Sequence, residues 1–512
     1  MSGWLRVWCA AILAAVAVPV WGQTAQTSSG SGDGSQTYTI RTTVPLVVLD
    51  VVVTDAKGRP VTDLSRADFR VQEADAPQTI LNFEVAGARM PPANATIDST
   101  ADLDRIAPHA PVQIIVLDEF NTRFEDMAFA RYSLKKFLKK QPAKLAMPTM
   151  LIAVDLQRFA VLHDYTENKQ EILEALNKHL VSYPWRVNQV MWVPERYAAA
   201  FLTLRRVAQA TMGHPGHKNM IWIGRGFPPF DFTDAPVDTE RRVDTAVQEC
   251  VNELRDARIT LYTIDPAGLM SNPGKYGPVA AFNDPFGGNY QFAALAKATG
   301  GTALYGRNDV DAEIGTAIQD GADFYTLTYR PTNDSTDPQK FRRIKVTLDR
   351  PGLKVMTREG YYLQYGPGRV DPSKPSRRLV ADLVAADSST MVYDGVPITA
   401  ARSQKDPGLF DIHLDAQGLY WTPATETEAR HTDFILIAST FDSKGKELMR
   451  DAKSYRVPAT GEVPPAGPLQ RAVDVEYHVN PGTTAVRVRF TVRMTSSGRI
   501  GTVDVPVGPE KR

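Results

Sequence analysis

Oxygen-bearing side chains follow an apolar stretch that begins at Val112. The sequence there reads VQIIVLDEFNTRFED, so Asp118 and Glu119 are followed closely by Asn121 and Thr122. Carboxylate, amide and hydroxyl oxygens are the ligands that hard cations such as Mg²⁺ and Mn²⁺ prefer. An open α/β sheet binds its ligands where the strands end. The sequence therefore predicts either a working metal or ligand site here, or the remains of one.

Further candidates follow later apolar stretches. Arg225 comes after KNMIWIG, and Asp265 ends ITLYTID. Asp265 either lines the same cleft or caps the turn at Pro266, and we favour the cap because Asp commonly bonds to the backbone two residues on. His214 and His217 in GHPGHK have a spacing that can bind zinc, but no third ligand accompanies them. We therefore expect these two histidines in a solvated loop.

Apolar strands and amphipathic helices alternate through the middle of the chain. Strands are expected at 112–118, 148–155, 158–165, 218–224, 259–265 and 302–306, and helices at 124–141, 166–180, 195–213, 238–258 and 289–301. This alternation predicts an α/β fold with a doubly wound, mostly parallel sheet covered on both faces.

Segments rich in β-branched residues, with a period of two, flank this α/β block. Residues 37–90 and 377–512 are each predicted to form a β-sandwich-like module. The remaining predicted segments are a Pro-rich linker at 91–110, the α/β block at 111–330, its β extension at 331–366 and a second linker at 367–376.

The first 22 residues have the features of an export signal. Arg6 precedes an apolar core from Cys9 to Val20, and the expected cut follows Gly22. Residues 23–36 are rich in Ser and Gly and predict a flexible leader. We therefore expect an exported protein, periplasmic or extracellular, with no transmembrane span after cleavage of the signal.

Charge and cysteine content argue against two classes of protein. The 58 basic and 58 acidic residues give a formal net charge of zero, which argues against a nucleic-acid partner. Once the signal is removed, Cys250 is the one cysteine left, so an intramolecular disulfide is excluded. Its helical surroundings, AVQECVNELRDA, predict a buried side chain rather than a nucleophile.

The middle of the chain resembles the von Willebrand factor type A fold. The resemblance rests on VQIIVLDEFNT, KNMIWIGRGFP, RITLYTIDPAG and LAKATGGTAL, in that order. A fuller resemblance, over about residues 40–365, is to a bacterial subfamily often called VWFA-related and common in acidobacterial genomes. Its members pair a leading module like VVVTDAKGRPVTDLSRADFRVQE with a variant type A domain, and close with segments like FYTLTYRP and FRRIKVTLDRPGLKVMTREGYY. They generally have no assigned function, so the resemblance implies a fold more than a role.

The usual type A domain implies a Mg²⁺ or Mn²⁺ site, which this chain retains in part. The site uses Asp-x-Ser-x-Ser after the first strand, a Thr in a later loop and an Asp after the fourth strand. Asp118 matches the first Asp and Thr122 the second Ser, but Phe120 stands at the first Ser. LVSYPWRVNQV at 180–190 lacks the usual Thr of the loop, and Arg225 holds the fourth-strand position.

These departures predict a domain without a metal. We expect Arg225 to pair with Asp118 or Glu119 and to replace the ion, because two buried carboxylates without a counter-charge would be costly. The alternative is a degenerate site in which Asp118 and Thr122 bind Mg²⁺ or Mn²⁺ weakly. No other cofactor is expected.

The function expected from these observations is binding or scaffolding. The variant type A domain would present its loops to a protein or glycan partner in the cell envelope. One alternative is a cleft hydrolase that uses Asp118, Glu119 and Asp265, and another is a weak Mg²⁺-dependent adhesion module. The sequence has no nucleophile elbow, phosphate-binding loop or dinucleotide motif, which favours a protein that is not an enzyme.

Overall fold

The computed structural model describes most of the chain. The described residues are 46–155, 159–181, 193–226, 237–267, 292–332, 340–362, 377–425, 427–461, 463 and 469–507, with the backbone alone at 193–198, 237–244, 377–378 and 381. The predicted export signal and leader, and most of the 180–190 loop, lie outside them.

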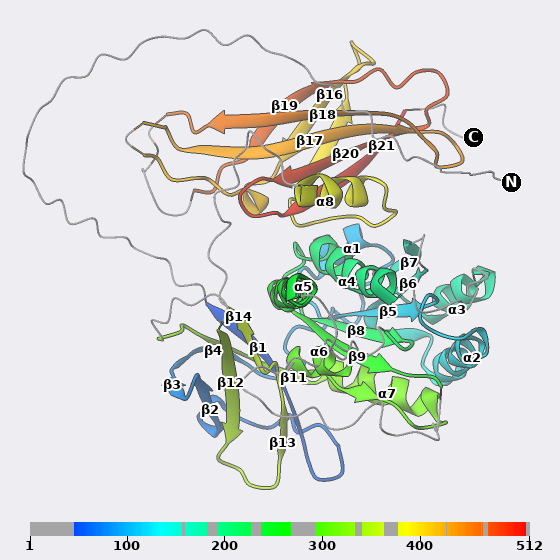
Figure 1. The fold of residues 1–512 in the computed structure, drawn as a ribbon, viewed down its shortest axis with the longest axis vertical. Helices are drawn as coiled ribbons and strands as arrows, with labels where there is room; N and C mark the ends of the chain where they lie inside the picture. The colour runs from blue at the N-terminus through cyan, green and yellow to red at the C-terminus, as the bar shows by residue number, and fades with distance from the viewer. Residues whose placement is uncertain are drawn as a thin grey trace, which may run out of the picture. The chain divides into compact units, whose positions relative to one another are not determined.

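A six-stranded mixed sheet organises the middle of the chain (Figure 1). Its strands are β5 (Val112–Asp118), β6 (Lys144–Val154), β7 (Phe159–Asn168), β8 (Lys218–Ile223), β9 (Ile259–Ile264) and β10 (Ala303–Leu304). They lie in the order β10-β9-β8-β5-β6-β7, and β7 alone is antiparallel to its neighbour. The expected α/β class is confirmed as a mixed α/β fold.

Helices cover both faces of this sheet. Successive strand residues point to opposite sides, and here both sides are apolar, so each face needs a cover. Their bounds are α1 (Thr100–Ile106), α2 (Phe124–Lys140), α3 (Lys169–Lys178), α4 (Val193–Ala210), α5 (Val237–Asp256), α6 (Phe292–Ala298) and α7 (Val310–Ala322). Ile114 and Val116 of β5 pack in one core with α1, α4, α5 and α6. Ile115 and Leu117 pack in the other with α2, α3 and α7. Every residue of β5 is buried, including Asp118.

Two antiparallel sheets combine strands from before and after the α/β block. Their strand orders are β13-β1-β11-β4 and β14-β12-β2-β3, and they share one apolar core. The bounds are β1 (Val47–Thr54), β2 (Phe69–Glu73), β3 (Ala76–Gln78), β4 (Ile80–Glu84), β11 (Phe324–Tyr329), β12 (Phe341–Leu348), β13 (Lys354–Met356) and β14 (Gly360–Tyr362). Segments expected in separate modules, at 37–90 and 331–366, therefore pair with each other. β11, expected inside the α/β block, joins them.

Two further antiparallel sheets enclose a core near the C-terminal end. Their strand orders are β15-β16-β19 and β18-β17-β20-β21. The bounds are β15 (Ile398–Arg402), β16 (Leu409–Leu414), β17 (His431–Phe441), β18 (Glu447–Pro458), β19 (Val473–His478), β20 (Arg487–Met494) and β21 (Ile500–Pro506). A helix that was not predicted, α8 (Arg377–Asp387), precedes them, and α1 and α7 were also not predicted.

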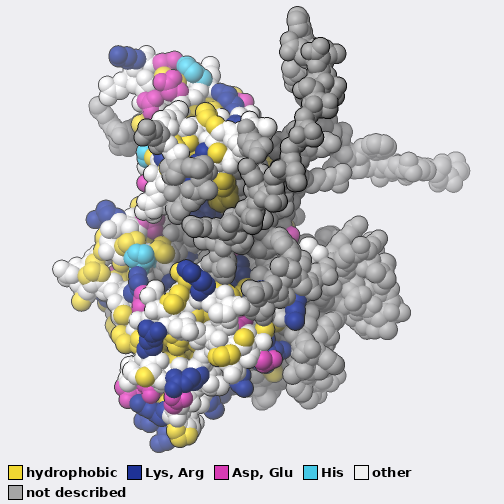
Figure 2. Space-filling model, turned by 90° about the vertical axis from the view of Figure 1, so that its left-hand side faces the viewer, with side chains coloured by type: hydrophobic (Ala, Val, Ile, Leu, Met, Phe, Trp, Pro, Cys, Tyr) yellow, Lys and Arg dark blue, Asp and Glu magenta, His cyan; other side chains and the backbone are white. Residues whose placement is uncertain are grey.

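The described surface carries a mixture of charges. Basic, acidic and apolar side chains lie interspersed on the face drawn in Figure 2. Among the described residues, no helix combines the length and apolar character needed to cross a membrane.

Candidate functional site

Three candidate side chains stand at the carboxyl ends of neighbouring parallel strands. Asp118 ends β5, Arg225 follows β8 and Asp265 follows β9, and these strands are adjacent in the sheet. Parallel strands end at the same side of a sheet, so the predicted grouping of these three positions follows from the topology. We call this region the carboxyl edge; its candidate residues are Asp118, Glu119, Asn121, Thr122, Arg225 and Asp265.

The Asp118 carboxylate is buried and fully used by neutral donors. Its Oδ1 accepts hydrogen bonds from the backbone N–H groups of Phe120 (3.2 Å) and Asn121 (2.9 Å). Its Oδ2 accepts from the Trp222 indole (3.1 Å) and from the Gly226 N–H (2.8 Å). Burial raises the pKa of Asp118 to about 7, although all four hydrogen bonds oppose that rise. Asp118 therefore serves to hold the loops together.

Two glycines let the segment after β8 approach Asp118 closely. Gly224 has φ +147°, and a Cβ atom there would lie 2.4 Å from the Asp118 Cβ. Gly226 has φ +64°, and a Cβ atom there would lie 2.1 Å from the Phe292 ring. The Gly-x-Gly pattern around Arg225 was thus a sequence signal for close backbone packing.

Phe120 and Thr122, at the Ser positions of the expected metal motif, make other contacts, whereas the side-chain amide of Asn121 beside them makes no hydrogen bond to a described residue. Phe120 is buried and meets Trp222 edge-on, with ring centroids 6.2 Å apart. The Thr122 Oγ1 accepts a hydrogen bond from the Arg225 backbone N–H at 3.2 Å. The side-chain amide of Asn121 is buried and has no hydrogen-bond partner among the described residues.

Arg225 does not pair with Asp118 or Glu119, so that prediction is wrong. Its guanidinium lies 3.5 Å from Asp126 Oδ2 and 3.7 Å from Asp265 Oδ1. The physical reason is access: the Asp118 oxygens are enclosed by four donors, whereas the Arg225 side chain, 24% exposed, reaches outward to Asp126 at the start of α2. A fixed cation does stand at the carboxyl edge, but between a different pair of carboxylates.

Asp265 and Glu119 have partners of their own. The Asp265 Oδ1 accepts a hydrogen bond from the Ala267 N–H at 3.0 Å, as expected for a turn cap. Glu119 is buried, and its Oε1 lies 2.7 Å from Nε2 of His179. His179 was not among the predicted site residues, because it follows α3 and lies 60 residues from Glu119 in the chain. The position of a histidine just after a helix does not predict that its side chain contacts Glu119.

This arrangement does not fit a divalent cation. The groups that point at Asp118 are N–H donors, whereas a hard cation needs oxygen ligands. Within the described part of the chain, no three His, Cys, Asp or Glu side chains are grouped so as to hold a metal.

Two other predictions concern histidine and cysteine. His214 and His217 are buried rather than solvated, so the solvated-loop prediction is wrong. His214 Nε2 contacts the Ala110 carbonyl at 2.7 Å, and His217 Nδ1 contacts Asp50 at 2.9 Å. Cys250 is buried, as predicted, and burial raises the pKa of its thiol, which makes it a poor nucleophile.

Comparisons with known proteins give structural similarities alone. No family model and no curated protein matches the chain. Among solved structures, the SpRpn10 VWA domain is 14% identical, covering 33% of this chain and 99% of that one, with a TM-score of 0.17. The pilus adhesin SpaC from Lactobacillus rhamnosus GG is 10% identical, covering 85% of this chain and 58% of that one, with a TM-score of 0.26. These similarities are too low to bear on function.

Proposed function

We propose that this chain is an exported binding or scaffold protein without enzymatic activity. Its α/β block would be a variant von Willebrand factor type A domain, held between β-sandwich modules. The carboxyl edge would bind an acidic group of a protein or glycan partner in the cell envelope. The signal-like segment at residues 1–22 supports export, and the strand and helix alternation of the α/β block supports the type A assignment.

The position of Arg225 is the observation that supports this proposal most. In the usual type A domain the metal ion attracts a partner's carboxylate. Here the guanidinium stands at the same edge, partly exposed, and both of its ion pairs are longer than 3.4 Å. Arginine favours bidentate contacts with carboxylates, so a partner's acidic group would gain contacts that Asp126 and Asp265 make poorly.

The hydrolase alternative finds less support. It needs Asp118, Glu119 and Asp265 to act on one substrate, but each has its own partner. Asp118 holds four neutral donors, Glu119 contacts His179, and Asp265 caps a turn. A general acid or base must reach the proton that it transfers, and the enclosed Asp118 does not.

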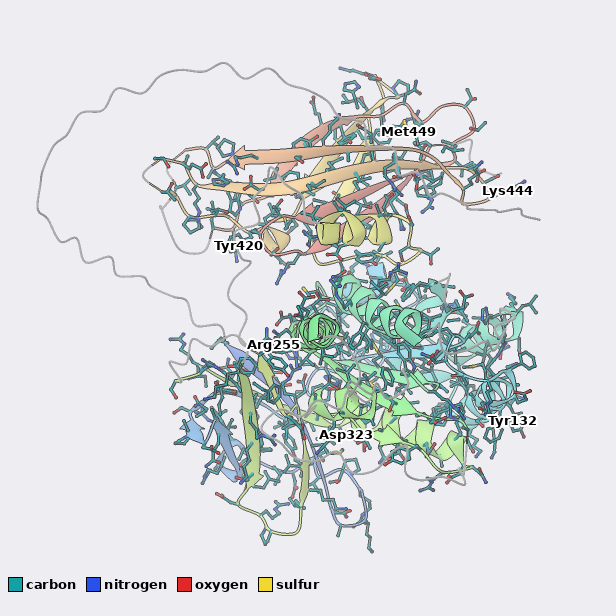
Figure 3. All side chains as sticks on the ribbon, viewed as in Figure 1. Tyr132, Arg255, Asp323, Tyr420, Lys444 and Met449 are labelled. Atoms are coloured by element: carbon teal, nitrogen blue, oxygen red, sulfur yellow. The ribbon has the colours of Figure 1, made fainter. Side chains whose placement is uncertain are left out.

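Site-specific photocrosslinking tests the binding proposal. A photoreactive phenylalanine derivative replaces Phe124, which begins α2 beside the carboxyl edge and is 50% exposed. The matched control replaces Tyr132, two turns along the same helix and 63% exposed (Figure 3). In envelope extracts we expect one crosslinked partner at Phe124, little at Tyr132, and a loss of at least about tenfold in crosslinking when Arg225→Gln is added.

Two outcomes contradict the proposal. One is equal crosslinking at Phe124 and Tyr132. The other is a Phe124 crosslink that Arg225→Gln leaves unchanged, since the cation would then play no part in binding.

A metal titration separates the proposal from the Mg²⁺-dependent alternative. We expect no saturable heat when Mg²⁺ or Mn²⁺ is added to the protein in a calorimeter, because Asp118 and Thr122 already accept hydrogen bonds from N–H groups. Micromolar binding that Asp118→Ala abolishes would show that the weak adhesion module is the correct alternative.

A further inference from the structure

A pocket lies at the opposite side of the six-stranded sheet, where β8 and β9 begin. It is a shallow pocket with a cavity volume of about 20 Å³, so a ligand larger than a water molecule extends through its open mouth. Nitrogen-rich side chains line it: His217 directly precedes β8, Arg258 directly precedes β9, and Arg89 and His109 face it from the segment between β4 and β5. We call this region the amino edge. No part of it belongs to the carboxyl edge, because the two lie at opposite ends of β8.

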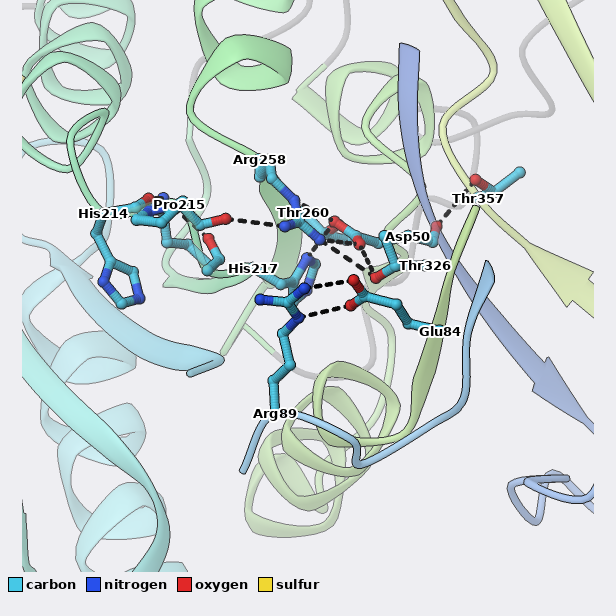
Figure 4. Close-up of polar contacts among 12 residues, drawn as sticks. Asp50, Glu84, Arg89, His214, Pro215, His217, Arg258, Thr260, Thr326 and Thr357 are labelled. Carbon is cyan, nitrogen blue, oxygen red and sulfur yellow. Dashed lines mark hydrogen bonds and ion pairs between the residues drawn. The ribbon is translucent and has the colours of Figure 1, made fainter. Parts of the chain in front are cut away.

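Asp50 of β1 fixes the two inner groups of this pocket (Figure 4). His217 Nδ1 lies 2.9 Å from one carboxylate oxygen, and Arg258 contacts both oxygens. Thr326 Oγ1 donates to Asp50 at 3.0 Å, and Arg258 Nη1 donates to the Pro215 carbonyl at 2.8 Å. These contacts determine the orientation of the imidazole and guanidinium before any ligand arrives.

The imidazole of His217 offers an acceptor to the pocket. Burial lowers the pKa of His217 against the opposing effect of Asp50, so the ring is neutral near pH 7. The Asp50 carboxylate can only accept a hydrogen bond, since Arg258 and His217 outweigh burial and hold its pKa far below the ordinary range. The ring proton therefore sits on Nδ1, and Nε2 keeps its lone pair.

Arg89 and His109 supply nitrogen atoms that bond to no other described residue. Nε and Nη2 of Arg89 contact Glu84, and the third guanidinium nitrogen, Nη1, stands clear of that pair (Figure 4). His109 is exposed, lines the pocket and makes no hydrogen bond or ion pair to another described residue. The pocket therefore holds two guanidinium groups, two imidazoles and two nearby carboxylates. Both carboxylates are already paired with arginine: Glu84 with Arg89 and Asp50 with Arg258.

We propose that the amino edge binds a small protonated oxyanion of the phosphate type. Arg89 Nη1 and His109 donate hydrogen bonds to its oxygens, and its P–OH group donates to Nε2 of His217. A phosphate group carries both the acceptors that the arginine needs and the donor that the neutral imidazole needs. Sulfate has the same shape but no O–H near neutral pH, and acetate lacks that donor too. Inorganic phosphate keeps a P–OH group near neutral pH, and a phosphate monoester keeps one only in its monoanion, since its second pKa is about 6.

Calorimetric titration of the full-length protein, in phosphate-free buffer at pH 7, tests the proposal. We expect saturable binding of inorganic phosphate that is at least about tenfold tighter than binding of sulfate or acetate, because those ligands leave Nε2 without a donor. Titration with a small phosphate monoester then distinguishes the two sources of the group. Tighter binding of the monoester assigns the pocket to an organic phosphate, and tighter binding of inorganic phosphate assigns it to the free ion.

Variants of exposed arginines show whether binding occurs in this pocket. His217 and Arg258 variants are unsuitable, because their contacts with Asp50 hold the fold. Arg89→Gln changes a side chain that is 42% exposed, and it should weaken phosphate binding at least about tenfold. Arg70→Gln is the matched control: Arg70 lies on β2, is 58% exposed and pairs with Asp349 outside the pocket. No saturable phosphate binding, equal affinity for sulfate, or equal losses in the two variants would each overturn the proposal.

Discussion

The two ends of strand β8 lead to buried carboxylates that are neutralised in different ways. At the carboxyl edge, Asp118 accepts hydrogen bonds from three backbone N–H groups and one indole. At the amino edge, Asp50 meets the guanidinium of Arg258 and the imidazole of His217. Neutral donors offset only part of the desolvation free energy of a buried carboxylate, whereas a neighbouring cation offsets more of it.

The pKa values move in opposite directions for this reason. Burial raises the pKa of Asp118 to about 7, and its four hydrogen bonds do not offset that effect. Burial acts on Asp50 as well, but Arg258 and His217 outweigh it and lower the pKa. Burial alone therefore does not determine the charge of a carboxylate; the kind of partner does.

Replacing the charged partner at the amino edge should have the largest effect. Asp50→Asn leaves Arg258 and His217 without a carboxylate, and we expect it to lower the free energy of unfolding by about 3–5 kcal/mol. Urea denaturation measures this loss. Asp55→Asn is the control, because Asp55 pairs with the exposed Arg59 at the surface and its replacement should cost much less. Equal losses would mean that the Asp50 cluster adds nothing beyond a surface ion pair.

The close packing around Asp118 gives the next largest expected effect. Gly224→Ala forces a side chain into a backbone conformation that favours glycine and into contact with Asp118, so we expect a loss of about 2–4 kcal/mol. Gly58→Ala separates the two causes. Gly58 also has a positive φ, +77°, but open space around its Cβ position, and should cost only about 1 kcal/mol. Similar losses for the two variants would show that the carboxyl edge tolerates expansion.

The sequence predicted the positions at the carboxyl edge better than their contacts. Apolar strands followed by Asp118, Arg225 and Asp265 indicate a shared edge, because strand order and direction place them together. The partner of Arg225 depends on how far its long side chain reaches around a loop. The pattern of apolar and polar residues does not predict that contact. Glu119 and His179 meet across 60 residues of chain for the same reason.

The amino edge was missed because its parts come from distant segments. GHPGHK has the composition of a loop, yet His217 is buried against Asp50, which lies 167 residues earlier in the chain. That contact requires β1 to pair with β11, whereas the alternation of strands and helices suggested that β11 belonged to the α/β block. Local patterns identify elements well, but pairing between remote strands requires tertiary information.

The pH dependence of two Asn variants sharpens the comparison. Asp118→Asn replaces an oxygen that faces two N–H donors with an NH2 group, and it should cost about 1–3 kcal/mol at pH 5, where the wild-type carboxyl group is protonated. The folded protein binds the Asp118 proton more tightly than the unfolded chain, so wild-type stability falls as pH rises from about 4 to about 7. The cost of Asp118→Asn should therefore shrink between pH 5 and pH 8.

The cost of Asp50→Asn should not change with pH over the same range. The lowered pKa of Asp50 gives a contribution that is complete above pH 4 and is lost as pH falls below that value. The cost of the mutation should thus be constant from pH 5 to pH 8. Urea denaturation of wild type and both variants across this range checks the pair of predictions, and parallel pH profiles for the two variants would contradict them.

The smallest expected effect is that of replacing Arg225, which follows β8, and Arg258, which precedes β9, is its contrast. Arg225 is partly exposed and lies 3.5 and 3.7 Å from its partners, so Arg225→Gln should lower the free energy of unfolding by less than about 1 kcal/mol. Arg258→Gln leaves Asp50 buried beside a neutral side chain and should cost several times more. Urea denaturation of the two variants measures the difference. An arginine that contributes little to stability is free to exchange its partners for a ligand's carboxylate, whereas one that the fold depends on is not. Equal costs would make Arg225 a structural group and would remove the basis for a ligand at the carboxyl edge.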